Sequence, residues 1–151
     1  MNNDAIYSSP PLGYLLYRCF RAVTNDLAHR FEAHGCPITV EQWRVLAVLR
    51  LRNGQTQNEL SLFLGQEKTG VSRLIRALEK KGYIYRKSEE ADRRVRRVFL
   101  TKKARTQEDE FLQLAIQTLD VARTGLNDED LSQFKGYLTT VITNLEGNNG
   151  E

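Results

Sequence analysis

The fold is decided by the residues from Thr56 to Gly82, TQNELSLFLGQEKTGVSRLIRALEKKG, within a chain of 151 residues. They open with a capping box, in which the Thr56 hydroxyl and the Glu59 carboxylate each accept a hydrogen bond from a backbone amide at a helix start. Gly65 ends this short helix, and a second apolar period begins a few residues later. The second period predicts a helix over 67–81. Its apolar face is formed by Val71, Leu74, Ile75 and Leu78. Two helices joined by so short a turn predict a helix-turn-helix.

A charged hairpin follows these two helices. The segments 83–87 and 96–100 are short and rich in residues that favour strands, and the stretch 88–94 between them is highly charged. Upstream, a second capping box at Thr39 and Gln42 opens another helix. Three helices followed by a basic hairpin are typical of a winged helix-turn-helix. Residues 39–101, called the winged core below, are predicted to form this unit.

Long amphipathic helices are predicted on both sides of the winged core. Apolar residues recur every three or four positions over 12–31, and a similar helix is expected after Thr101. A last helix, capped by Asn127, carries a nearly heptad stripe formed by Leu131, Phe134, Leu138, Val141, Ile142 and Leu145. The predicted fold class is therefore mainly α, a winged helix-turn-helix core of three helices plus a β-hairpin wing with long N- and C-terminal dimerisation helices.

The flanking segments indicate assembly. Residues 1–38 are expected to form a loose arm and the first dimerisation helix, and residues 102–151 two further dimerisation helices and a polar tail. Their stripes have more apolar surface than one small core can cover. This excess predicts a homodimer with two-fold symmetry.

Charge is concentrated in the winged core. Residues 40–105 contain 17 Lys/Arg and 7 Asp/Glu, a net charge of +10, whereas the rest of the chain contains 5 and 12, a net charge of −7. A basic middle region between acidic flanks is the pattern expected of a protein that binds double-stranded DNA.

Other classes of protein receive no support. The longest uncharged run, 5–17, is too short and too polar to span a bilayer, so no membrane partner is expected. Two cysteines are too few for a disulfide scaffold and fit a reduced cytoplasmic setting. No nucleotide-binding or hydrolase motif and no paired acid–base residues occur, so neither an enzyme nor a cofactor is expected.

The second helix of the helix-turn-helix carries the candidate DNA-reading residues. A helix fits the major groove of B-DNA, where polar side chains of its first turns reach base edges. The candidates outside the apolar face are Gln66, Lys68, Thr69, Ser72, Arg73 and Arg76. We expect Arg73 or Arg76 to read a base and Lys68 to bind phosphate.

The hairpin carries four arginines within five positions. Strand alternation sends Arg96 and Arg97 to opposite faces, whereas Arg93 and Arg94 lie in the turn. The turn residues are therefore free to enter the minor groove, where the potential is most negative. Asp92 is expected to hold one of these arginines in a fixed orientation through a charge-assisted pair.

The stretch 39–101 resembles the DNA-binding core of the MarR family of bacterial transcriptional regulators. The matching segments are TVEQW at 39–43, TQNEL at 56–60, LGQEKTGVSRL at 64–74, LEKKG at 78–82 and YR at 85–86, followed by Asp92, Arg94, Val98, Leu100 and Thr101. The resemblance implies a homodimer built from the first, fifth and sixth helices. It also implies binding to a palindromic operator, with release by a small ligand or by thiol oxidation. We expect the regulator to be a repressor, although the sequence leaves activation open.

The same resemblance assigns roles in the wing and marks two departures. The family's D-x-R wing motif implies that Arg94 is the minor-groove residue and that Asp92 orients it. Relatives often have a glycine where this chain has 102–104, KKA, and many have an acidic residue at the position of Arg76. The second departure makes the groove-facing helix more basic than usual.

Four aromatic residues are candidates for an effector site. They are Tyr14, Tyr17, Phe20 and Trp43. Either they line a pocket for a small aromatic or phenolic ligand between the dimerisation helices and the winged core, or they belong to the ordinary core.

A thiol- or metal-responsive regulator is the alternative. Cys19 lies on an apolar stripe and is expected to be a buried, inert thiol, whereas Cys36 follows a glycine in a loop and is expected to be exposed. His29 and Glu32 share a helix face, but no histidine in the fifth helix completes a zinc site, so no metal is expected. A further alternative is an interaction module that binds DNA or protein without sequence choice.

Overall fold

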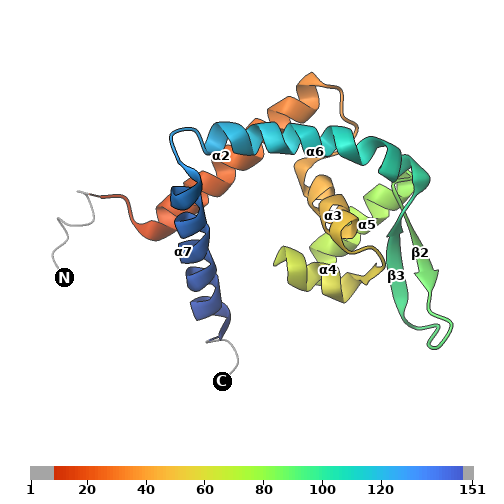
Figure 1. The fold of residues 1–151 in the computed structure, drawn as a ribbon. Helices are drawn as coiled ribbons and strands as arrows, with labels where there is room; N and C mark the ends of the chain where they lie inside the picture. The colour runs from red at the N-terminus through yellow and green to blue at the C-terminus, as the bar shows by residue number, and fades with distance from the viewer. Residues whose placement is uncertain (1–8, 148–151) are drawn as a thin grey trace.

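The computed structural model describes residues 9–147, which form six helices and three strands (Figure 1). In chain order they are α2 (Leu12–Ala33), α3 (Val40–Leu51), β1 (Gln55–Thr56), α4 (Gln57–Leu64), α5 (Lys68–Lys80), β2 (Ile84–Ser88), β3 (Arg96–Leu100), α6 (Lys102–Ala122) and α7 (Asp128–Gly147). This is the predicted class, a mainly helical winged helix-turn-helix. The loose arm and the polar tail fall mostly at 1–8 and 148–151, outside the described residues.

Both predicted capping boxes form. The Thr39 hydroxyl accepts from the Gln42 amide at 3.1 Å, and the Gln42 side chain accepts from the Thr39 amide at 3.2 Å. Thr56 and Glu59 repeat the arrangement at the start of α4, with distances of 3.2 and 2.7 Å. Gly65 ends α4 with a φ of 59°, in the left-handed region that favours glycine. These local signals give the helix-turn-helix its short turn.

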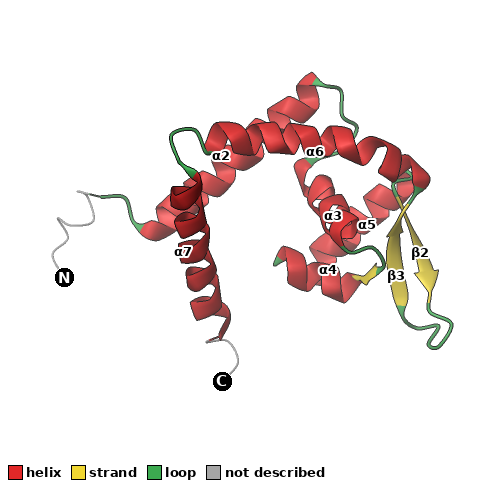
Figure 2. Ribbon diagram, viewed as in Figure 1, coloured by secondary structure: helices red, strands yellow, loops and turns green. Residues whose placement is uncertain are grey.

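The wing contains a strand that the sequence pattern did not predict. The sheet is antiparallel in the order β1-β3-β2 (Figure 2). Tyr85 pairs with Phe99 between β2 and β3, and Gln55 of β1 pairs with Val98. A strand of two residues cannot show an alternating pattern, so sequence reasoning missed it. Because β1 runs directly into α4, the hairpin is attached to the helix-turn-helix.

The core lies where the winged core meets α6. The ring of Phe111, in α6, lies 5.8 Å from Phe31, 6.1 Å from Trp43 and 6.2 Å from Tyr83, measured between centroids. All four side chains are buried. Tilted and edge-to-face contacts of this kind stabilise aromatic clusters beyond their buried area. They fix α6 on the winged core.

The flanking helices differ in how they are packed. α2 and α6 lie side by side in Figure 1 and are joined by Asp26, which binds Arg30 at 2.7 Å and accepts from the Thr118 hydroxyl at 2.7 Å. The bond from Arg30, and then that from Thr118, lower the pKa of Asp26. α7 has no buried residue and makes few contacts with the rest of the described chain.

Candidate DNA-binding surface

α5 presents two chemically different faces. Val71, Ile75 and Leu78 are completely buried against the winged core. Among the predicted DNA-reading residues, Gln66 and Ser72 are half-buried, and the exposed ones are Lys68, Thr69, Arg73 and Arg76. The apolar face therefore locks the helix in place while the polar face stays open to a groove.

Two polar contacts order the open face. The Arg76 guanidinium donates to the Ser72 hydroxyl at 3.3 Å, one turn earlier. The Gln57 amide donates to the Lys68 carbonyl at 3.1 Å, which ties the start of α4 to the start of α5. The start of α5, the helix called the recognition helix below, is thus held relative to the preceding helix.

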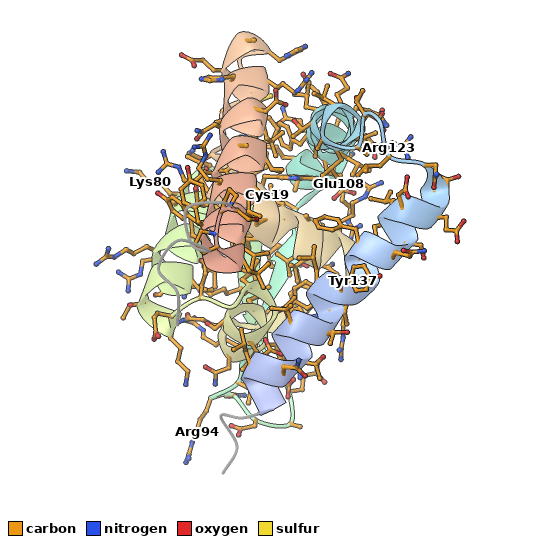
Figure 3. The ribbon with its side chains drawn as sticks, turned by 90° about the vertical axis from the view of Figure 1, so that its left-hand side faces the viewer. Cys19, Lys80, Arg94, Glu108, Arg123 and Tyr137 are labelled. Atoms are coloured by element: carbon orange, nitrogen blue, oxygen red, sulfur yellow. The ribbon has the colours of Figure 1, made fainter. Side chains whose placement is uncertain are left out.

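The wing tip has the arginines that the sequence placed there, but Asp92 binds differently from the prediction. Its carboxylate accepts from the backbone N–H of Arg94 at 2.9 Å, and its carbonyl accepts from the Val95 N–H at 3.0 Å. Within residues 9–147 no ion pair joins Asp92 to an arginine. Asp92 therefore shapes the turn through the backbone, as short acidic side chains commonly do. The guanidinium of Arg94 projects from the tip (Figure 3), and that of Arg93 is also exposed.

An ion pair that sequence reasoning missed joins the recognition helix to the wing. Arg86 of β2 donates to both carboxylate oxygens of Glu79, at 2.7 and 3.3 Å. The hydrogen bonds from Arg86 lower the pKa of Glu79, and those to Glu79 raise the pKa of Arg86. The pair spans a helix, a glycine turn and a strand, so no single periodicity could indicate it.

A hollow of about 340 Å³ brings α4, α5 and the wing onto one surface. Its walls are formed by Thr56, Gln57, Asn58, Ile75, Arg86, Arg94, Val95, Arg96 and Val98. Arg94 and Arg96 give it a positive charge on the side of the wing that faces the recognition helix. A helix and a basic hairpin on one face can contact adjacent grooves of a duplex.

The four aromatic candidates do not come together within the protomer. Trp43 is only 6% exposed and belongs to the core. Tyr14, Tyr17 and Phe20 are exposed on α2, and the guanidinium of Arg44 lies 4.7 Å from the centre of the Phe20 ring. The core interpretation holds for Trp43, whereas the other three form an exposed aromatic surface.

Within the protomer, neither cysteine has the burial that the sequence predicts. Cys19 is exposed on α2 (Figure 3), on the side of the helix that borders α6 and α7. It lines an apolar groove of about 440 Å³ between α2, α6 and α7, together with Phe134 and Leu138. Cys36 is half-buried against the core instead of being exposed. Burial, and then the nearby Glu110 carboxylate, raise the pKa of the Cys36 thiol.

These surroundings make Cys36 a poor redox sensor, because the thiolate is the reactive form. At pH 7.5 we expect the Cys19→Ser variant, which keeps Cys36, to react with a disulfide reagent more slowly than free cysteine does. The reaction rate should still be rising at pH values above 9.0, the ordinary pKa of a cysteine thiol. Stopped-flow absorbance against a pH series measures this. Reaction faster than free cysteine would restore Cys36 as a candidate switch.

Within residues 9–147 no group of three His, Cys, Asp or Glu side chains is placed to hold a metal ion. None of the helices over the same residues is both long and apolar enough to cross a membrane.

A winged helix-turn-helix with a basic recognition face defines a class of DNA-binding proteins, and similar proteins identify the family. The family model for MarR matches residues 37–95. The helix-turn-helix transcriptional regulator YwoH of Bacillus subtilis is 33% identical over 114 residues, covering 76% of this chain and 81% of YwoH. The transcriptional activatory protein BadR of Rhodopseudomonas palustris is 27% identical over 139 residues, covering 89% and 78%. The crystal structure of an S. aureus MepR–DNA complex has a TM-score of 0.80 and 25% identity, covering 90% and 99%. The chain belongs to the MarR family of transcriptional regulators, which are DNA-binding proteins and not enzymes.

Proposed function

We propose that this regulator is a homodimeric repressor that binds a palindromic operator in a sequence-specific way and is released by a small ligand. The observation that carries the proposal is the pairing of an ordered basic face on α5 and the wing with an uncovered apolar stripe on α7. The basic face can bind one half of the operator, and the apolar stripe can join two protomers that each bind one half. In this proposal residues 39–101 form the DNA-binding domain, and residues 1–38 and 102–151 form the dimerisation segments.

The apolar groove between α2, α6 and α7 supports the dimer. Exposed apolar surface of this extent usually marks an interface, and a second copy is the commonest partner. In such a dimer Cys19 would be covered by the partner chain. Because the two recognition helices are then related by a two-fold axis, the operator is expected to be a palindrome.

In this proposal some residues contact bases and others contact the DNA backbone or shape the wing. Arg73 or Arg76 reads a base in the major groove, supported by Gln66, Thr69 and Ser72, and Lys68 binds phosphate. Arg94, with Arg93 beside it, enters the minor groove, and Asp92 shapes the turn that carries them.

The effector is proposed to be a small aromatic or phenolic molecule that binds at Tyr14, Tyr17 and Phe20. These rings are exposed on α2, and Arg44 beside Phe20 supplies a positive charge next to an apolar ring. Since α3 carries Arg44, a ligand bound there would touch both a dimerisation helix and the winged core.

Footprinting and selection from random DNA test the main proposal. A repressor dimer should protect a two-fold symmetric site whose half-sites lie about 10 bp apart, centre to centre. A reporter gene under such a site should be expressed more strongly when the regulator is deleted. Higher expression in the presence of the regulator would make it an activator, as the name of BadR describes that relative. Equal affinity for all sequences would favour the non-specific interaction module.

The wing makes a separate prediction. Arg94→Ala should lower affinity for every duplex, and most for operators with A·T pairs beside each half-site, because a narrow minor groove has the strongest negative potential. The slope of log affinity against log salt should weaken by about one per subunit. Fluorescence anisotropy over a salt series measures both effects. Arg105→Ala, which removes an exposed charge on α6 outside the wing, is the control. An equal loss in the two variants would contradict the minor-groove role.

A further inference from the structure

Arg97 of the wing makes contacts different from those of its neighbours. Whereas Arg96 lines the hollow next to the recognition helix, Arg97 lies on the other face of the hairpin. Its guanidinium donates to the Gly54 carbonyl at 3.0 Å and lies 3.4 Å from the Glu59 carboxylate, and its Nε pairs with the Glu89 carboxylate. The three partners belong to the turn before β1, the first turn of α4 and the start of the wing loop. One side chain therefore connects the wing to the helix-turn-helix.

The Glu59 carboxylate takes part in two interactions at once. Its Oε2 accepts from the Thr56 backbone N–H at 2.7 Å, as part of the capping box, and also faces the Arg97 guanidinium. The bond from the Thr56 backbone is the main cause of the lowered pKa of Glu59, and the charge of Arg97 acts in the same direction. The carboxylate is thus ionised at neutral pH. The same oxygen holds the start of α4 and the strand that leads to the wing tip.

This arrangement matters for geometry more than for stability. The side chains of Arg97, Glu59 and Glu89 are 36%, 40% and 30% exposed, and ion pairs so accessible to water contribute little to folding. The planar guanidinium nevertheless fixes the direction of its partners, which a lysine cannot do. A binding group must be held to within about 0.5 Å to act together with a second one.

We propose that Arg97 is a positioning residue for DNA binding, which holds the wing at the angle to α5 that lets the wing tip and the recognition helix bind one site together. The proposal rests on the proposed function, in which Arg94 enters the minor groove. Arg97 itself touches no DNA in this scheme. Its loss should therefore remove the contribution of the wing to sequence preference while the recognition helix still reads its bases.

The test compares Arg97→Met with Lys87→Met. Lys87 is the cross-strand neighbour of Arg97 and is exposed, so both variants lose one positive charge at the same level of the wing. The probe is the duplex that the wild-type protein selects from a random library, prepared with either A·T or G·C pairs beside each half-site. Fluorescence anisotropy gives the Kd of each duplex over a salt series, and circular dichroism gives the thermal midpoint.

Arg97→Met should lose about tenfold in affinity for the A·T-flanked duplex and most of its preference over the G·C-flanked one. Lys87→Met should keep that preference. Because a misplaced wing tip no longer holds Arg94 in the minor groove, Arg97→Met should weaken the salt slope as Arg94→Ala does, and more than Lys87→Met does. Arg97→Lys restores the charge without the planar fork, so it should recover neither the preference nor the salt slope. Glu89→Gln weakens the same anchor from its other end and should lower the preference too.

Three outcomes would overturn the positioning role alone. The first is an equal flank preference in Arg97→Met and Lys87→Met. The second is full recovery of the preference in Arg97→Lys. The third is an equal loss on both duplexes with a lower thermal midpoint, which would make Arg97 a residue of the fold alone. A wild-type protein with no flank preference would instead refute the minor-groove role in the proposed function, and the positioning role with it.

Discussion

Replacing Phe134 and Leu138 together by glutamate is expected to convert the regulator from a dimer into a monomer and to weaken operator binding by two orders of magnitude or more. Both side chains line the apolar groove between α2, α6 and α7, which a second copy is proposed to cover. Two carboxylates in that groove would have to be desolvated in the dimer, which costs several kcal/mol. A monomer then binds one half-site without the effective concentration that linkage supplies, a loss of about 10²–10⁴-fold.

Sedimentation velocity at micromolar protein and anisotropy on the selected duplex measure the two effects. Thr139→Glu is the matched control, because Thr139 is exposed on α7 and its hydroxyl bonds the Lys135 carbonyl of its own helix. The control should remain a dimer and bind normally. A monomeric wild-type protein would refute the proposed assembly, and a dimeric Phe134→Glu/Leu138→Glu variant would show that another surface holds the two chains together.

Replacing the arginine of the recognition helix that reads a base should cause the second large loss of operator affinity. A base-reading arginine is worth about 1–3 kcal/mol in each half-site, so a dimer uses it twice and should lose about 2–6 kcal/mol on its operator. Arg73→Ala and Arg76→Ala, made singly, identify which side chain reads the base. The variant at the reading position should also tolerate other bases at one operator position. Arg76 donates to Ser72 in the free protein, so its guanidinium is already ordered over the first turns.

Competition binding with selected and random duplexes measures this specificity. Lys80→Ala is the control, since Lys80 is an exposed cation in the last turn of α5, away from the first turns (Figure 3). Lys80→Ala should lower the affinity for both duplexes slightly and equally. If Arg73→Ala and Arg76→Ala each behave like this control, neither arginine reads bases, and specificity resides elsewhere on the surface.

Much of the fold could be predicted from the sequence because its signals are local. The capping boxes at Thr39 and Thr56 join residues three positions apart, and Gly65 needs only its own backbone conformation. The apolar period of α5 and the arginines of the wing are likewise properties of short segments. These features predict the helix-turn-helix, the hairpin and the polar face of α5.

The helices, the hairpin and the basic face follow from the sequence alone, since each depends on neighbours within about one turn of helix or one pair of strands. Which groups meet across the fold depends on tertiary packing. It paired Glu79 with Arg86 and Arg97 with Glu59, added β1 to the sheet, and directed the Asp92 carboxylate to a backbone amide. It also packed Cys36 half-buried against the core and left Cys19 exposed on the protomer, because an apolar stripe shows that a face will be covered and not which surface covers it.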